Sequence, residues 1–106
     1  MSQNMTRNHY TDFVKHSIRF YITCPDQLDV AGHTAAEVNN WIAVQTVFAD
    51  LEPEERRFVT DVYRRNKVDF VEAVRTCCKT HEMSENDAWK LLSRVVARIA
   101  RVRGLV

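Results

Sequence analysis

The sequence contains little glycine, proline or cysteine, and it has no long hydrophobic run. Only 2 Gly and 2 Pro occur in 106 residues, so the residues that hairpins and strand turns need are scarce and helices are favoured. No apolar run approaches the roughly 20 residues that a membrane helix requires. The first residues also lack the charged-then-apolar pattern of a signal peptide. We therefore expect a cytoplasmic, mainly helical protein with no membrane partner.

The cysteines, Cys24, Cys77 and Cys78, do not match a disulfide or zinc pattern. Their number is odd, two are adjacent, and no Cys-x-x-Cys occurs, so reduced, partly buried thiols are the natural interpretation. Adjacent residues on a helix cannot both face one ligand, and no His/Asp pair lies near them in the sequence. These features argue against a catalytic thiol.

No motif for catalysis or cofactor binding is present. The chain has no glycine-rich phosphate loop, no Gly-x-Ser-x-Gly and no His-Glu-x-x-His, so we expect neither an enzyme nor a bound cofactor. His9, Asp12 and His16 share a helix face at a spacing compatible with a metal site. Arg19 lies on the same face and no fourth ligand is evident, so we interpret this group as ordinary surface.

Charge is distributed unevenly along the chain, whose net charge is +1. Residues 1–52 contain 3 Lys/Arg against 6 Asp/Glu, whereas residues 53–106 contain 12 against 8. From position 90 onward there are cations and no acid: Lys90, Arg94, Arg98, Arg101 and Arg103. A basic C-terminal end suggests a polyanionic partner. The alternative is a solvated helix end, since cations also suit a helix C-terminus.

Apolar periodicity and cap signals predict an all-α fold of about five helices. The first spans residues 7–21, and the second begins with a capping box at Thr34-Ala-Ala-Glu37. The third runs from Pro53, a favoured first helical residue, to near Asn66. The fourth follows a cap signature at Asp69-Phe-Val-Glu72, with Val68 and Ala73 placed for a hydrophobic staple. The last follows an N-cap at Ser84 and runs to about Arg103, with Gly104 as its stop.

The predicted helices divide the chain into two parts. Residues 1–50 form a two-helix segment that braces or dimerises the protein, and residues 51–106 form a three-helix unit. The predicted inner faces are Tyr10, Phe13, Val14, Ser17, Ile18 and Tyr21; Val38, Trp41, Ile42, Gln45 and Phe48; Phe58, Val59, Val62 and Tyr63; and Phe70, Val74, Cys77 and Cys78.

The last helix has two contrasting faces. A stripe at helical spacing must be buried: Ala88, Leu91, Leu92, Val95, Ile99 and Val102. The opposite face is small, polar and basic: Asn86, Lys90, Ser93, Arg94, Ala97 and Arg101. A helix that enters a DNA major groove needs these properties, because short residues allow close approach and Asn, Lys and Arg can reach base edges or phosphates. Trp89 lies at the boundary between the faces.

Three short motifs in the second half resemble a known family. Leu51-Glu-Pro-Glu-Glu-Arg, Val62-Tyr63-Arg64-Arg65, and Met83-Ser84 before a long Arg-rich helix resemble region four of bacterial sigma factors and their small relatives. That family begins its domain with Leu-x-Pro-x-Glu-Arg and enters its recognition helix through an aliphatic-Ser cap. The chain also resembles short uncharacterised proteins of bacterial mobile elements and prophages, which share an aromatic N-terminal helix and a basic end such as Arg103-Gly104-Leu105-Val106.

The resemblance implies a helix-turn-helix that binds double-stranded DNA and regulates transcription in a mobile element or prophage. Residues 70–81 would be the supporting helix and residues 85–103 the recognition helix. The expected base-reading residues are Asn86, Trp89, Lys90, Ser93 and Arg94, and the expected backbone contacts are Arg75, Lys79, Arg98 and Arg101. RNA polymerase is a candidate partner and a homodimer a candidate assembly.

The chain departs from the family at the turn and at the start of the last helix. Glu82 stands where the family often has Gly, and a non-Gly residue with positive φ is strained there by about 1 kcal/mol. Glu82, Glu85 and Asp87 also place acids where phosphates would approach. The alternative function is therefore a helical protein-interaction module that keeps the fold without binding DNA. An enzyme is a distant third interpretation.

Overall fold

The computed structural model describes residues 2–65 and 68–105, with side chains described from Tyr10 onward. Within these ranges the chain forms helices and no strand. The elements are α1 (Ser2–Thr23), a short 3-10 helix η1 (Val30–Gly32), α2 (Ala35–Ala49), α3 (Pro53–Arg64), α4 (Phe70–His81) and α5 (Glu85–Arg103). The all-α class with five α-helices is thus confirmed. None of the described helices is long and apolar enough to cross a membrane.

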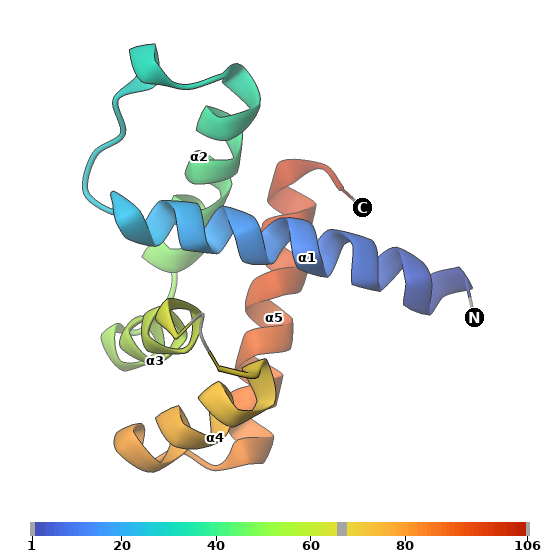
Figure 1. Cartoon of the computed structure of the whole chain (residues 1–106), viewed down its shortest axis with the longest axis vertical. Coiled ribbons are helices and arrows are strands. Elements are labelled where there is room, and N and C mark those ends of the chain that lie inside the picture. The colour runs from blue at the N-terminus through green and yellow to red at the C-terminus, as the bar shows by residue number, and fades with distance from the viewer. Residues whose placement is uncertain (1, 66–67, 106) are drawn as a thin grey trace.

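Helix α1 crosses the molecule and contacts α2, α3 and α5 (Figure 1). Helix α5 extends from α4 near its start to α2 near its end, so it contacts elements from both halves of the sequence. At its end, Arg103 Nε donates a 2.6 Å hydrogen bond to Asn40 Oδ1 of α2. Helix α3 packs against α4 on the side away from α2.

One continuous core joins all the α-helices and extends across the expected boundary at residues 50–51. Its largest fully buried side chains are Phe48, Phe58, Ile18 and Ile99, which come from α2, α3, α1 and α5. Burying an aromatic side chain contributes about 1.5–3 kcal/mol relative to leaving it exposed. The first half of the chain therefore belongs to the same hydrophobic core as the second half.

The predicted inner face of α3 is buried, and that of α4 is buried apart from half-buried Phe70, whereas those of α1 and α5 were each wrong at one position and that of α2 at two. Phe13 is 38% exposed, Ile42 46% and Val102 50%, and Gln45 is exposed as well. Helix α2 lies between α1 and α5, so its buried face comprises Trp41, Ala43, Val44, Val47 and Phe48. Near the end of α5, Ala100 is buried where Val102 was expected, because a small residue lets another helix approach closely.

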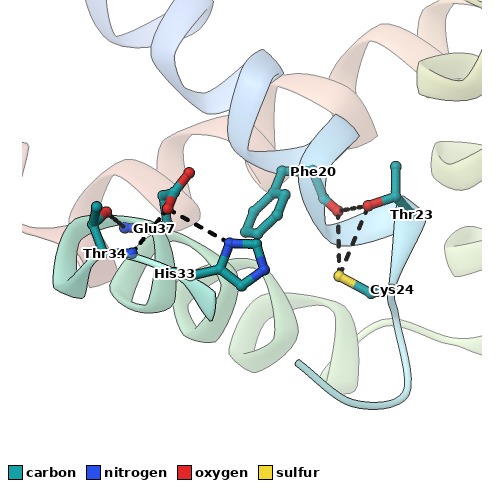
Figure 2. A network of polar contacts seen from close by, with 6 residues as sticks. All are labelled: Phe20, Thr23, Cys24, His33, Thr34 and Glu37. Atoms are coloured by element: carbon teal, nitrogen blue, oxygen red, sulfur yellow. Dashed lines mark hydrogen bonds and ion pairs between the residues drawn. The ribbon is translucent and has the colours of Figure 1, made fainter. Parts of the chain in front are cut away.

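The helix starts show which cap signals fold as expected (Figure 2). Thr34 Oγ1 accepts from Glu37 N–H at 3.2 Å, and Glu37 Oε1 accepts from Thr34 N–H at 2.9 Å, which confirms the capping box. His33 Nδ1 lies 3.5 Å from the same Glu37 oxygen, and its ring packs edge-on against Phe20, 5.1 Å between centroids. Asp69 is the N-cap residue of α4, as predicted, but its side chain makes no cap hydrogen bond.

The helix ends differ from the prediction by a few residues. Helix α1 continues to Thr23, whose hydroxyl donates to the Phe20 carbonyl at 2.6 Å (Figure 2). Helix α3 ends at Arg64, and the expected end near Asn66 lies outside the described residues. Val68 is exposed at 48%, which does not fit a hydrophobic staple. Helix α5 ends at Arg103 with Gly104 in the left-handed region at φ 83°, as predicted.

The Leu-x-Pro-x-Glu-Arg segment forms the junction between α2 and α3. Leu51 is buried, Pro53 is the first residue of α3, and Glu55 Oε1 accepts from the Glu52 N–H at 3.0 Å. Arg56 reaches back to the end of α2, where Nε donates to the Phe48 carbonyl at 3.0 Å and Nη2 to the Leu51 carbonyl at 3.1 Å. The motif thus ties the start of α3 to the end of α2 through side-chain hydrogen bonds to backbone groups.

Candidate nucleic-acid interface

A tight turn joins α4 to α5. Glu82 lies in the left-handed region at φ 54° and ψ 47°, and its backbone N–H and that of Met83 both donate to the Cys78 carbonyl. Ser84 then caps α5, its Oγ accepting from the Asp87 N–H at 3.1 Å. The turn therefore has the geometry that glycine usually provides, with glutamate in the glycine position.

The outward face of α5 exposes a stripe of short or flexible polar residues. Asn86, Lys90, Ser93 and Arg101 are exposed, and Ala97 between them is half-buried. No ion pair involves Lys90 or Arg101 within the described part of the chain. We call these residues, 86, 90, 93, 97 and 101, the outward stripe. It is accessible, slim and basic, as the sequence predicted for a helix that approaches a polyanion.

Two arginines beside the outward stripe pair with acids from the α2–α3 junction. Arg94 Nη2 donates to Glu55 Oε2 at 2.9 Å, across 39 residues of sequence. Arg98 Nη2 donates to Asp50 Oδ2 at 2.7 Å, across 48 residues. The hydrogen bond from the Glu52 backbone, followed by that from Arg94, holds the pKa of Glu55 below its ordinary value despite partial burial. Glu55 thus caps α3 with one oxygen and positions Arg94 with the other.

The two α4 residues expected to contact the DNA backbone, Arg75 and Lys79, lie at the end of the interface where α5 begins with acids. Arg75 Nε lies 3.4 Å from Glu85 Oε1, with both side chains more than half exposed. Lys79 is exposed. Glu82, Glu85 and Asp87 are all exposed around the turn. The α4 end of the interface therefore has mixed charge, whereas the middle and end of α5 are basic.

Trp89 lies beside the outward stripe, and together with Ser93 and Ala97 it lines a pocket to which α1 contributes. It is half-buried, and its ring lies 5.9 Å from that of Phe70, centroid to centroid. The ring of Tyr63 lies 5.4 Å from that of Phe70, also centroid to centroid. Among the five residues expected to read bases, Trp89 is the one that the fold places in an aromatic contact with α4.

A polar cluster that the sequence did not reveal lies between α3 and α4. His81 Nε2 lies 3.0 Å from Asp61 Oδ2, and Arg65 Nε lies 3.4 Å from Asp61 Oδ1. The Cys77 thiol interacts with Asp61 and Arg65. Two patterns could have indicated it, since positions 77 and 81 share one helix face, and so do positions 61 and 65.

The pKa values within this cluster follow from burial and hydrogen bonding. Burial opposes ionisation of Asp61, but the hydrogen bond with His81, the charge of Arg65 and the thiol of Cys77 together lower its pKa. Burial raises the pKa of the Cys77 thiol, which is fully buried. A neutral, enclosed thiol is a poor nucleophile, and the contacts of Asp61 with His81 and Cys77 join α3 to α4.

No group of three or more His, Cys, Asp and Glu that could hold a metal occurs among residues whose side chains are described. Of the three residues at metal-like spacing in α1, the side chain of His9 lies outside this description. Comparison with protein-family models, with curated proteins and with solved structures finds no match to the chain. Functional inference therefore depends on the geometry of the chain itself.

Proposed function

We propose that this protein binds duplex DNA by placing α5 in the major groove. The observation that supports the proposal most directly is the outward stripe on a helix that starts directly after a tight turn. An α-helix fits the major groove when its outer face lacks bulky residues, and the stripe contains Asn86, Ser93 and Ala97 where the backbone would come closest. Asn86 and Lys90 near the start of the helix are then placed to reach base edges.

The flanking arginines would contact phosphates by exchanging partners. Arg94 and Arg98 project from the side of α5 that faces the α2–α3 junction, where each is held by one carboxylate. Both side chains are about half exposed, so a phosphate oxygen can approach each guanidinium group and replace its carboxylate partner. Arg101 continues the same edge, and Arg75 and Lys79 of α4 would meet the backbone at the other end.

The resemblance to region four of sigma factors extends this proposal to transcription. In that role the protein would regulate a mobile element or prophage, with RNA polymerase as a further partner and a homodimer as the assembly that increases affinity. A single helix-turn-helix module buries modest area on DNA, so tight binding needs such an additional contact.

The proposal is tested by fluorescence anisotropy with a pool of random-sequence duplexes at 50 and 200 mM salt, followed by selection of bound sequences. We expect binding that weakens steeply with salt, because each neutralised phosphate releases counterions. Lys90→Ala should weaken binding to a selected sequence by roughly 1–3 kcal/mol, and Arg101→Ala should reduce the salt slope by about 1.

Arg57→Ala is the matched control. Arg57 is exposed on α3, on the helix face opposite Phe58, Val59 and Val62. Its replacement by Ala changes the net charge of the protein by the same amount as Lys90→Ala or Arg101→Ala. It should leave DNA affinity nearly unchanged. Absence of binding at 50 mM salt, or equal losses from Lys90→Ala and Arg57→Ala, would contradict the proposal.

A protein-interaction module is the second candidate, and a specific observation favours it. Glu82, Glu85 and Asp87 surround the start of α5, and Arg75, Arg94 and Arg98 already have carboxylate partners. Under this alternative the mixed-charge end of the helix pair would bind a protein surface, and no duplex in the pool would be retained at either salt concentration.

A further inference from the structure

A largely apolar groove lies between α1 and α5, beside the outward stripe. Its volume is about 450 Å³, which falls within the range of about 300–1,000 Å³ typical of small-molecule sites. The side chains that line the groove include Tyr10 and Lys15 of α1, Tyr63 of α3, Phe70 of α4, and Trp89 and Ser93 of α5. Because four helices contribute, the groove is formed by the tertiary fold and could not be located from one segment of sequence.

Aromatic rings form one side of the groove. Tyr63, Phe70 and Trp89 follow one another with tilted ring contacts of 5.4 and 5.9 Å between centroids, and Tyr10 lines the groove from α1. Burial raises the pKa of Tyr63 to about 12, so its hydroxyl is neutral at physiological pH. Such a surface favours a flat, apolar ring system, which can make offset or edge-on contacts with several side chains at once.

One positive charge lies against this aromatic surface. Lys15 Nζ is 5.6 Å from the centroid of the Phe70 ring, and the side chain is half-buried. No carboxylate lies within ion-pair distance of it in the described part of the chain, although Asp12 also lines the groove. A partly desolvated ammonium with aromatic neighbours attracts an anion more strongly than an exposed lysine does.

We propose that this groove binds a small planar aromatic carboxylate. Its ring system lies against Phe70 and Trp89, and its carboxylate accepts hydrogen bonds from the Lys15 ammonium. The combination of ring contacts and one opposite charge distinguishes such a ligand from a neutral or cationic aromatic compound of the same shape. The groove shares Ser93 and Ala97 with the outward stripe, but the titration below contains no DNA, so it tests ligand binding separately from the proposed DNA contact.

The test is a titration of the ¹⁵N-labelled full chain followed by two-dimensional NMR. The probes are 2-naphthylacetate, the neutral 2-naphthylmethanol and the cationic 2-naphthylmethylamine, which share one ring system. The indole N–H signals of Trp89 and Trp41 provide an internal comparison. We expect 2-naphthylacetate to shift the Trp89 signal saturably and leave that of Trp41 in place, and we expect the neutral and cationic probes to bind about tenfold or more weakly.

Two variants make the test decisive. Lys15→Gln should weaken 2-naphthylacetate about tenfold and leave 2-naphthylmethanol unchanged, and Ala97→Leu should weaken both by filling the groove. Comparing the two probes on one variant separates loss of the charge contact from a general loss of folding. Equal affinities for the three probes, a Lys15→Gln effect on both probes alike, or saturable shifts confined to Trp41 would overturn the proposal.

Discussion

Replacing Glu82 by glycine should stabilise the protein. Glu82 is the residue other than glycine that adopts a positive φ in the described chain, at φ 54°. At the equivalent position after α5 the chain has Gly104 at φ 83°. In both turns the following backbone N–H returns to the carbonyl five residues earlier, Met83 to Cys78 at 3.0 Å and Leu105 to Ala100 at 2.8 Å. The same turn thus occurs once with glycine and once with a strained residue.

The expected change in the free energy of unfolding for Glu82→Gly is the difference between two opposing effects. A residue with a Cβ atom loses about 1–2 kcal/mol in the left-handed region, whereas glycine adds about 0.5–1 kcal/mol of conformational entropy cost on folding. The Glu82 side chain is exposed and makes no recorded ion pair within the described residues, so little else is lost. We expect Glu82→Gly to raise the free energy of unfolding by about 0.5–1 kcal/mol and Tm by roughly 2–6 °C.

Thermal unfolding followed by circular dichroism at 222 nm measures this effect. Glu82→Gln is the control, because it removes the charge and keeps the Cβ atom. Its Tm should stay within about 1 °C of the parent, as for most exposed substitutions. A lower Tm for Glu82→Gly would refute the reasoning about backbone strain. An equal increase in both variants would instead attribute the gain to removal of the charge.

Three further predictions concern the helix cap, the polar cluster and the thiols. Ser84→Ala should cost about 1 kcal/mol in chemical denaturation by leaving a backbone N–H uncapped, and Ser84→Asp should largely retain stability. Because the pKa of Asp61 lies below its ordinary value of 3.8, its contribution is complete above that pH and is lost as pH falls through the lower folded value. The stability difference between the parent and Asp61→Asn should therefore shrink on acidification below pH 3.8; a constant difference would count against the ion pair. In the native protein, half-buried Cys24 should react with a thiol reagent much faster than Cys77 and Cys78, whose burial raises both pKa values; equal rates would disprove the enclosed packing.

The parts of the fold that sequence predicts well depend on contacts between near neighbours. The capping box at Thr34 and Glu37, the cap at Ser84 and the stop at Gly104 each involve residues within four positions of one another, and all three have the expected geometry. The same holds for the buried stripe of α5 except at Val102. Local hydrogen bonds and helical periodicity are encoded within a single turn or two, so one segment suffices to predict them.

The features that sequence did not predict depend on how the helices pack. Phe13 and Ile42 fit a helical stripe, yet both are exposed. On α2, which contacts both α1 and α5, the buried face is shifted and includes Ala43, Val44 and Val47. The contact between His81 and Asp61 spans 20 residues. The groove beside Trp89 requires α1 to cross α5. None of these arrangements can be derived from periodicity, which gives the face of each helix but not the position of its neighbours.

The same limitation changes how the basic end of the chain should be interpreted. From the sequence alone, the run of cations without acids after position 90 suggests that all of them are available to a polyanion. In the folded chain, Arg94 and Arg98 face Glu55 and Asp50 at the α2–α3 junction, and Asp50 belongs to the acidic first half. The uneven charge distribution is thus partly compensated within the protein.

This compensation sets an expectation for the strength of DNA binding. Each phosphate that Lys90 or Arg101 neutralises contributes fully to the salt dependence, with a slope near −0.9 per contact on duplex DNA. An arginine that leaves a carboxylate for a phosphate exposes that carboxylate to solvent and to the DNA, so its net contribution is smaller. The salt dependence of binding should therefore match the unpaired cations rather than all the cations counted in α4 and α5. Specificity would then depend mainly on the short side chains of the outward stripe.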